Sequence, residues 1–342
     1  MQVLITGGAG FIGSNAAMYF LNKGYSVTIL DNFSRKGSVD NVEWLKKTAK
    51  IKPQIIKADI GIDFGKLKKA VKDKDLILHL AGQVAVTNSV LNPRIDFQSN
   101  ILGTFNILEA IRLNNYNPVL IYSSTNKVYG QLENIKVREK RTRYEFVNLP
   151  YGVNESQNVD FHTPYGCSKG AADQYVRDYS RIYGLNTIVF RQSCIYGPRQ
   201  FGVEDQGWLA WFIIALIRNK KITIYGNGKQ VRDVLYIEDL IKAYDLAFKN
   251  IKNTNGRIYN IGGGIKNTIS VWFEFGPILE KLFQKKITVT LAKSRRGDQP
   301  IYISDIRKAA DDFGWKPAIG YNKGIEQLYS WISENKEIFK NK

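Results

Sequence analysis

The chain contains little cysteine, histidine and proline for its length. Its 342 residues include two cysteines, two histidines and nine prolines. Cys167 and Cys194 are too few for a disulfide framework or a cysteine metal site, and His79 and His162 match no ligand spacing. We therefore expect no bound metal and a reducing, cytoplasmic location.

Long apolar runs are also missing. The longest, Trp208–Ile217, is about half of a membrane span. It predicts a helix that is buried or faces another subunit, so we expect no membrane association and a homo-oligomer, a dimer or a tetramer. The first residues already form a core strand, so we expect no signal peptide.

Acidic residues are fewer than basic ones, 31 against 49, and the formal net charge is +18. Such an excess can indicate nucleic-acid binding, but the basic residues are spread along the chain in short runs. There is no basic tail, zinc-finger spacing or RNA-recognition motif. We expect no nucleic-acid partner, and a basic surface that favours a polyanionic small substrate.

The most informative feature present is the glycine-rich turn Thr6–Gly13. It follows the apolar strand 2–6 and precedes a helical pattern, which is the context of a dinucleotide-binding turn. The next strand, 26–30, ends at Asp31, whose carboxylate can accept from ribose hydroxyls and would repel the extra phosphate of NADP. The pattern predicts NAD binding; a tight turn without a ligand is the alternative.

Strands and helices alternate through the first half, which predicts an α/β fold with a Rossmann-like, doubly wound parallel sheet. We expect an NAD-binding domain over 1–191, with a polar insertion at 131–160 that lies over the site. We expect a smaller C-terminal substrate-binding lobe over 192–342, interleaved with the first domain. The expected strands are 2–6, 26–30, 54–58, 75–80, 118–123 and 186–191, and a helix opens near Pro164.

A phenol and an ammonium group four residues apart carry the expected chemistry. Tyr165 and Lys169 would share a helix face, where the charge of Lys169 would lower the pKa of the phenol and its amine could hold the nicotinamide ribose. Such a phenol can take a proton from a substrate hydroxyl as hydride leaves. Ser123, Ser124 and Thr125 end a strand, where ligands bind in such folds. A surface Tyr/Lys pair is the alternative.

Together these motifs resemble the extended short-chain dehydrogenase/reductases that act on nucleotide sugars, over essentially the whole chain. The resemblance implies that Thr125, Tyr165 and Lys169 are catalytic. It implies a helix asparagine at Asn100 that supports the fold. The implied cofactor-binding residues, besides Tyr165 and Lys169, are Gly7, Gly10, Phe11, Ile12, Gly13, Asp31, Asn32, Asp59, Ile60, Leu80, Ala81 and Gln83.

Within this family the chain is most similar to the CDP-paratose 2-epimerases (CDP-tyvelose epimerases). Asn126 and Lys127 follow Thr125, where the 4,6-dehydratases have an Asp/Glu pair, so elimination of water is disfavoured. The resemblance implies NAD-dependent inversion of C2 of a CDP-hexose through a 2-keto intermediate. Other nucleotide-sugar epimerases (of CDP-glucose at C2 or UDP-sugars at C4), a nucleotide-sugar reductase and a catalytically idle sensor are the alternatives.

The substrate diphosphate requires cations, and two segments match the family's nucleotide-diphosphate contacts. Arg232 and Arg296 can each donate forked hydrogen bonds to phosphate, although surface ion pairs would explain them too. Asp298 could accept from the nucleotide ribose. The remaining expected substrate contacts are Asn126, Gln206 and Trp208. Cys194 stands where many relatives carry a substrate-contacting asparagine.

Overall fold

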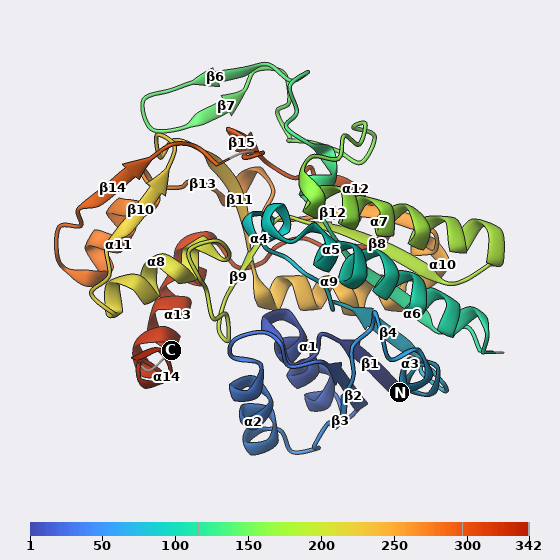
Figure 1. The fold of residues 1–342 in the computed structure, drawn as a ribbon. Helices are drawn as coiled ribbons and strands as arrows, with labels where there is room; N and C mark the ends of the chain where they lie inside the picture. Colours follow the sequence, from blue (N-terminus) through green and yellow to red (C-terminus); the bar gives the residue numbers. More distant parts are fainter. Residues whose placement is uncertain (115, 296, 341–342) are drawn as a thin grey trace.

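The computed structural model describes residues 1–114, 116–295 and 297–340. A seven-stranded parallel sheet of order β12-β8-β5-β4-β1-β2-β3 forms its centre (Figure 1). This confirms the Rossmann-like, doubly wound prediction. The strands are β1 (Gln2–Thr6), β2 (Ser26–Asp31), β3 (Gln54–Lys57), β4 (Leu76–His79), β5 (Val119–Thr125), β8 (Thr187–Gln192) and β12 (Arg257–Ile261).

Side chains alternate along these strands, so an apolar cluster lies on each face of the sheet. Val3 and Ile5 pack with one set of helices, whereas Leu4 packs with the other, as the period of a strand requires. The first set is α1 (Phe11–Asn22), α2 (Ser38–Thr48) and α9 (Ile237–Lys249); the second is α3 (Phe64–Ala70), α6 (Gly103–Arg112) and α7 (Thr163–Tyr183). Helices therefore cover both faces of the parallel sheet. Because the side chains on both faces of each strand are buried, the strands are continuous apolar runs in the sequence.

Short helical segments lie at the carboxyl end of the sheet, where the sequence pattern shows no strong period. After β4 come α4 (Val86–Leu91), α5 (Pro93–Asp96) and the π-helical turn η1 (Phe97–Leu102). After β5 comes the 3₁₀ turn η2 (Asn126–Tyr129). These segments position the side chains that follow the strand ends.

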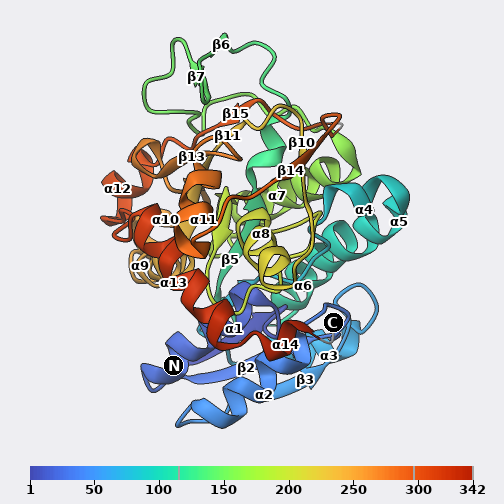
Figure 2. The same ribbon diagram turned by 90° about the vertical axis from the view of Figure 1, so that its left-hand side faces the viewer.

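The smaller lobe lies beside the carboxyl edge of the sheet (Figures 1 and 2). In it, β11 (Val231–Tyr236) pairs with β9 (Cys194–Tyr196), β13 (Thr268–Ser270) and β15 (Ile301–Tyr302), and β10 (Ile222–Tyr225) pairs with β14 (Val289–Ala292). Helix α8 (Trp208–Ile217) packs in the core of its own chain. Of the two positions expected for this apolar run, buried or facing another subunit, the structure shows the buried one. The remaining elements are α10 (Ile251–Thr254), η3 (Ile265–Asn267), α11 (Phe275–Phe283), α12 (Arg307–Phe313), α13 (Tyr321–Glu334) and α14 (Glu337–Lys340).

The segment 131–160 does not cover the site, contrary to our expectation. It forms a hairpin of β6 (Val137–Glu139) and β7 (Tyr144–Phe146), seen at the top of Figure 1. Val137, Tyr144 and Phe146 pack on an apolar cluster of β11 and β15. The apolar side chains of the hairpin thus pack against the outer side of the lobe. No residue of the segment 131–160 lines either of the two cavities described below.

Candidate active site

The glycine-rich turn brings the first strand close to its neighbour. Gly7 has φ +67°, and a Cβ there would lie 2.8 Å from the Cα of Ala81. A Cβ on Gly13 would lie 2.3 Å from the carbonyl oxygen of Gly7. Side chains at these two positions would push α1 and β4 away from the turn, so glycine is required for the close approach.

Asp31 lies opposite this turn with its carboxylate held in place. It accepts hydrogen bonds from the backbone N–H groups of Ala9 (3.0 Å) and Phe33 (2.8 Å). Burial raises the pKa of Asp31, and these two hydrogen bonds act in the opposite direction. Its neighbour Asn32 donates to Asp59 (2.7 Å). The carboxylate is therefore a fixed acceptor at one side of the cavity below.

A cavity of about 440 Å³ runs along the carboxyl ends of the central strands. Its volume lies within the range typical of cofactor sites. All twelve turn and strand-end residues expected to bind the cofactor line it: Gly7, Gly10, Phe11, Ile12, Gly13, Asp31, Asn32, Asp59, Ile60, Leu80, Ala81 and Gln83. The glycine cradle, the fixed Asp31 acceptor and this volume fit a dinucleotide. The sequence analysis missed Arg35, which also lines the cavity and hydrogen-bonds Gln206.

The three expected catalytic residues come from the end of β5 and the start of α7. Thr125 and Tyr165 are 7% and 8% exposed. Burial raises the pKa of Tyr165 to about 12, while the hydrogen bond with Thr125 acts to lower it. The strand-end hydroxyl and the phenol therefore lie close enough to interact.

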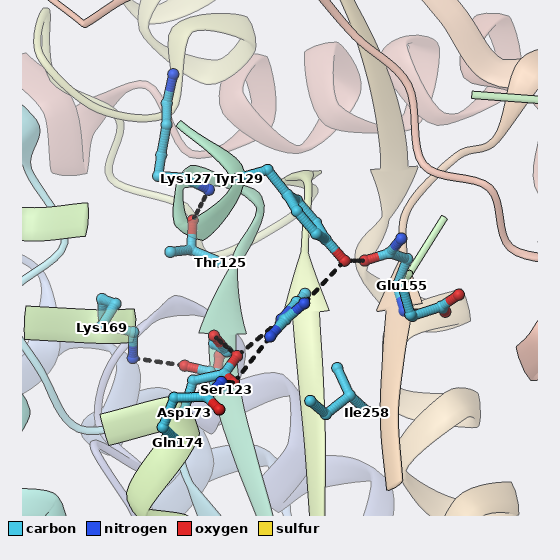
Figure 3. A network of polar contacts seen from close by, with 12 residues as sticks. Ser123, Thr125, Lys127, Tyr129, Glu155, Lys169, Asp173, Gln174 and Ile258 are labelled. Carbon is cyan, nitrogen blue, oxygen red and sulfur yellow. Dashed lines mark hydrogen bonds and ion pairs between the residues drawn. The ribbon is translucent and has the colours of Figure 1, made fainter. Parts of the chain in front are cut away.

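Lys169 does not lower the pKa of the phenol here, contrary to our expectation. Its ammonium donates to the carbonyl of Ser123 (2.5 Å; Figure 3) and lies 4.3 Å from the ring centroid of Tyr122. Burial lowers the pKa of Lys169 itself to about 7, although Asp173 and Asp96 act to raise it. Spacing on a helix face predicted the proximity of Tyr165 and Lys169 but not the depth at which both are buried.

A buried polar network lies behind this group. Asn100 donates to Ser168 (2.9 Å) and to the carbonyl of Gln83 (3.1 Å), and accepts from the Gln83 backbone N–H (2.9 Å). Asp96, 1% exposed, accepts from Gln83 (3.1 Å) and Ser168 (3.4 Å). Asn100 thus holds a strand-end loop against α7, a supporting role. Nothing in the sequence pattern singled out Asp96.

A second cavity, of about 520 Å³, lies between the smaller lobe and the carboxyl end of the sheet, where α4 and Lys127 also line it. Arg232 and Asp298 form an ion pair across it (2.6 Å), and the Lys127 ammonium lies 3.7 Å from the same carboxylate. Burial acts to raise the pKa of Asp298, but Arg232 and Lys127 hold it below its ordinary value. This end of the cavity is therefore rich in charge and suits a diphosphate.

Among the other expected substrate residues, Gln206 and Trp208 line this cavity. Asn126 does not; its amide oxygen accepts from Thr125 (3.3 Å) behind the strand end. Arg296 lies outside the described residues. Its neighbour Arg295, which the sequence analysis did not select, lines the cavity, pairs with Asp205 (3.0 Å) and stacks on Tyr225 at 3.9 Å.

The two cavities meet at Gln206, which lines both. The rest of the second cavity is largely apolar, and Cys194 contributes to its wall. The apolar residues that line it include Val86, Val90, Leu91, Trp208, Phe212 and Val271. A ligand with a charged end and a less polar end can therefore reach from the ion-pair cluster toward the first cavity.

Within the described residues, no cluster of three or more His, Cys, Asp or Glu side chains could hold a metal ion. Among the helices of that same part of the chain, none combines the length and the apolar character that crossing a bilayer requires.

The fold and the strand-end groups define an extended short-chain dehydrogenase/reductase. More narrowly, a family model for GDP-mannose 4,6 dehydratase matches residues 4–328, and the chain belongs to this family. It is 46% identical over 339 residues to a CDP-paratose 2-epimerase of Salmonella typhi, covering 97% of this chain and 99% of that one. A putative UDP-glucose 4-epimerase of Methanocaldococcus jannaschii is 33% identical over 334 residues, covering 98% and 99%.

Solved structures of this class superimpose closely. The UDP-glucuronic acid 4-epimerase of Bacillus cereus, in complex with UDP-glucuronic acid and NAD, has a TM-score of 0.83 and 28% identity, covering 98% of this chain and 100% of that one. The likeness extends over both the sheet and the smaller lobe, so both cavities lie within the shared fold.

Proposed function

We propose that this protein is an NAD-dependent nucleotide-sugar epimerase that inverts C2 of a CDP-hexose through a 2-keto intermediate. The substrate class and the cofactor are supported by the relatives and by the two cavities that meet at Gln206. The choice of C2 and of CDP rests on the 46% identity with the CDP-paratose 2-epimerase.

The observation that carries the proposal is the sequence Thr125-Asn126-Lys127 at the end of β5. Thr125 places a hydroxyl beside the Tyr165 phenol. The next two side chains are an amide that faces Thr125 and an ammonium beside Asp298. Neither residue is a carboxylic acid that could drive loss of water, so the site favours redox chemistry at one carbon over elimination.

In the proposed reaction, Tyr165 accepts the proton of the C2 hydroxyl, with Thr125 sharing that hydrogen bond. NAD, when bound, supplies the hydride acceptor, and Asp31 and the glycine-rich turn would hold it. Lys169 lies on the same helix, with its amine at the strand end of Ser123. The same phenol returns the proton when the ketone is reduced on its other face.

The ring must present both faces between the two half-reactions. Arg232, Lys127 and Arg295 would hold the diphosphate end, because all three cations line that cavity. The apolar wall makes few directional contacts with a sugar, so the ring can turn about its bonds to the diphosphate while the nucleotide stays bound. This division of the cavity supports epimerisation over a single reduction.

A substrate deuterated at C2 tests the proposal. In ordinary water, CDP-paratose labelled at C2 should give an inverted product that keeps its deuterium, because the abstracted hydrogen returns to the same carbon. NMR of the sugar, with CDP- and UDP-hexoses run beside it, identifies the inverted carbon. Loss of the label to solvent, or inversion at C4 of a UDP-sugar alone, would contradict the proposal.

A further inference from the structure

A third cavity, of about 500 Å³, lies outside both cavities of the proposed reaction. It opens between the 155–159 segment, α7, the edge strand β12, its neighbour β8, and α12. Four cations line it: Arg177, Arg191, Arg257 and Lys308. Gln157, Asn158, Gln174 and Glu155 supply neutral and acidic polar groups around them.

Arg191 is the most buried of these cations, at 3% exposure. It donates to both carboxylate oxygens of Asp173 (2.9 and 3.0 Å) and to the Tyr129 hydroxyl (3.1 Å). A guanidinium carries five N–H groups, so two remain. The three bonds fix its plane at the wall of the cavity, and a ligand would not have to order it.

The other cations differ in how far their charge is compensated. Arg257 pairs with Asp312 (2.8 Å), and Lys308 donates to the carbonyl of Ile258 (2.7 Å), while the charges of Glu155 and Asp312 act to raise its pKa against burial. Among the residues that the structure describes, Arg177 has no hydrogen-bond or ion-pair partner. Burial, together with Arg181 and Arg191, lowers its pKa, and the carboxylate of Asp173 acts in the opposite direction. An anion placed between Arg177, Arg191 and Lys308 would relieve this repulsion.

Glu155 supplies the opposite character within the same cavity. One of its carboxylate oxygens accepts from the backbone N–H of Asn260 (2.7 Å), which fixes the side chain. Figure 3 shows Glu155 and Ile258 on one side of the polar network, with Lys127 and Lys169 on the other. An anionic carboxylate repels a phosphate placed against it but accepts readily from a hydroxyl group. Since Glu155 and Lys308 also attract each other, the cavity carries charge of both signs and favours a ligand with both a phosphate and hydroxyl groups.

We propose that this cavity binds a small phosphate monoester that carries hydroxyl groups, such as a sugar phosphate. The phosphate would lie between Arg177, Arg191 and Lys308, where charge-assisted hydrogen bonds are available. The hydroxyls would face Glu155 and Gln174. The site adjoins the catalytic strand end, because Asp173, which holds Arg191, also accepts from Ser124 (2.8 Å).

The test uses the whole protein saturated with NAD and CDP, so that the phosphate contacts of the two other cavities are filled. Calorimetry then measures glucose 1-phosphate, inorganic phosphate and glucose at constant ionic strength. We expect glucose 1-phosphate to bind, inorganic phosphate to bind more weakly, and glucose not to bind detectably. Equal affinity for the two phosphates would contradict the hydroxyl contacts, and no binding of either would overturn the site.

Two matched variants distinguish a site from the general positive charge of the surface. Arg177→Gln should weaken glucose 1-phosphate binding roughly tenfold or more, since hydrogen bonds to a charged group are lost. Arg181→Gln removes the same charge one turn along α7, outside the cavity, and should change affinity less than about twofold. Equal losses would assign the binding to surface charge. Circular dichroism of both variants shows whether they fold. Lys308→Gln is a second cavity variant, which tests the site independently of Arg177.

Discussion

Replacing Arg232 with glutamine is the most direct test of the diphosphate end of the second cavity. Arg232 is 6% exposed, and its guanidinium donates to Asp298 (2.6 Å), to the carbonyl of Gln299 (2.7 Å) and to that of Val231 (2.7 Å). With five N–H groups, it keeps two for a phosphate. Hydrogen bonds to charged groups contribute about 1.5–3 kcal/mol, so CDP should bind roughly tenfold to a hundredfold more weakly.

The assay is calorimetry of CDP and, separately, of NAD. NAD affinity should stay within about twofold, because Arg232 does not line the first cavity. Arg143→Gln is the matched control. That arginine also pairs with an acid, Glu274 (3.4 Å), and lies in the hairpin segment on the outer side of the lobe, away from both cavities.

Arg232→Gln also removes a cation beside Asp298, while Lys127 at 3.7 Å and the charge of Arg295 remain. Thermal unfolding of the variant therefore has to be measured beside its affinity. The reasoning is refuted if CDP and NAD lose affinity equally in a folded protein, or if Arg143→Gln weakens CDP as much as Arg232→Gln does.

Three further predictions concern the catalytic group and the cofactor. Tyr165→Phe should fold normally and lose roughly 10²–10⁴ in turnover; near wild-type turnover would exclude the phenol as the proton acceptor. Lys169→Met should abolish turnover yet raise stability near pH 7 by on the order of 4 kcal/mol, because the folded pKa of about 7 lies below the ordinary 10.5 and a buried ammonium is costly. The wild type regains stability as pH rises from about 7 toward 10.5, so the difference in unfolding free energy should shrink over that range and is contradicted if it grows. Denaturing the purified protein should release NAD, measured by absorbance and mass, and recovery of NADP instead would contradict the role of Asp31.

Sequence patterns predicted the cofactor cavity well because its residues follow strand ends. The carboxyl ends of parallel strands meet at one edge of a sheet, so residues after β1, β2, β3 and β4 converge once the strands are recognised. The twelve residues that the family resemblance implied line one cavity. The segment 131–160 lacked such a constraint. Its position was decided by apolar contacts with β11 and β15, which local patterns do not encode.

The second cavity was harder to predict because distant segments build it. Arg295 lies in a loop, and a loop sequence does not indicate whether a side chain faces a cavity. Arg295 stacks on Tyr225 and pairs with Asp205, two residues from separate parts of the chain. Arg177 could not be selected either, because its place beside Arg191 depends on how α7 packs on β8.

Burial raises the pKa of the phenol and lowers that of the amine, and both shifts favour the neutral form of the group. It raises the pKa of Tyr165 to about 12 and lowers that of Lys169 to about 7, so near pH 8 both groups favour their neutral forms. Acid–base catalysis by this pair requires the phenol to ionise more easily than it does here. Asp96 does not provide this, because its negative charge raises both pKa values, and the charge of Arg35 lowers the pKa of Tyr165 by less than burial raises it. Further positive charge near the phenol would, and the oxidised nicotinamide of NAD carries one. We therefore expect the ionisation of Tyr165 to depend on bound NAD, which gives an epimerase a physical reason to retain its cofactor through every cycle.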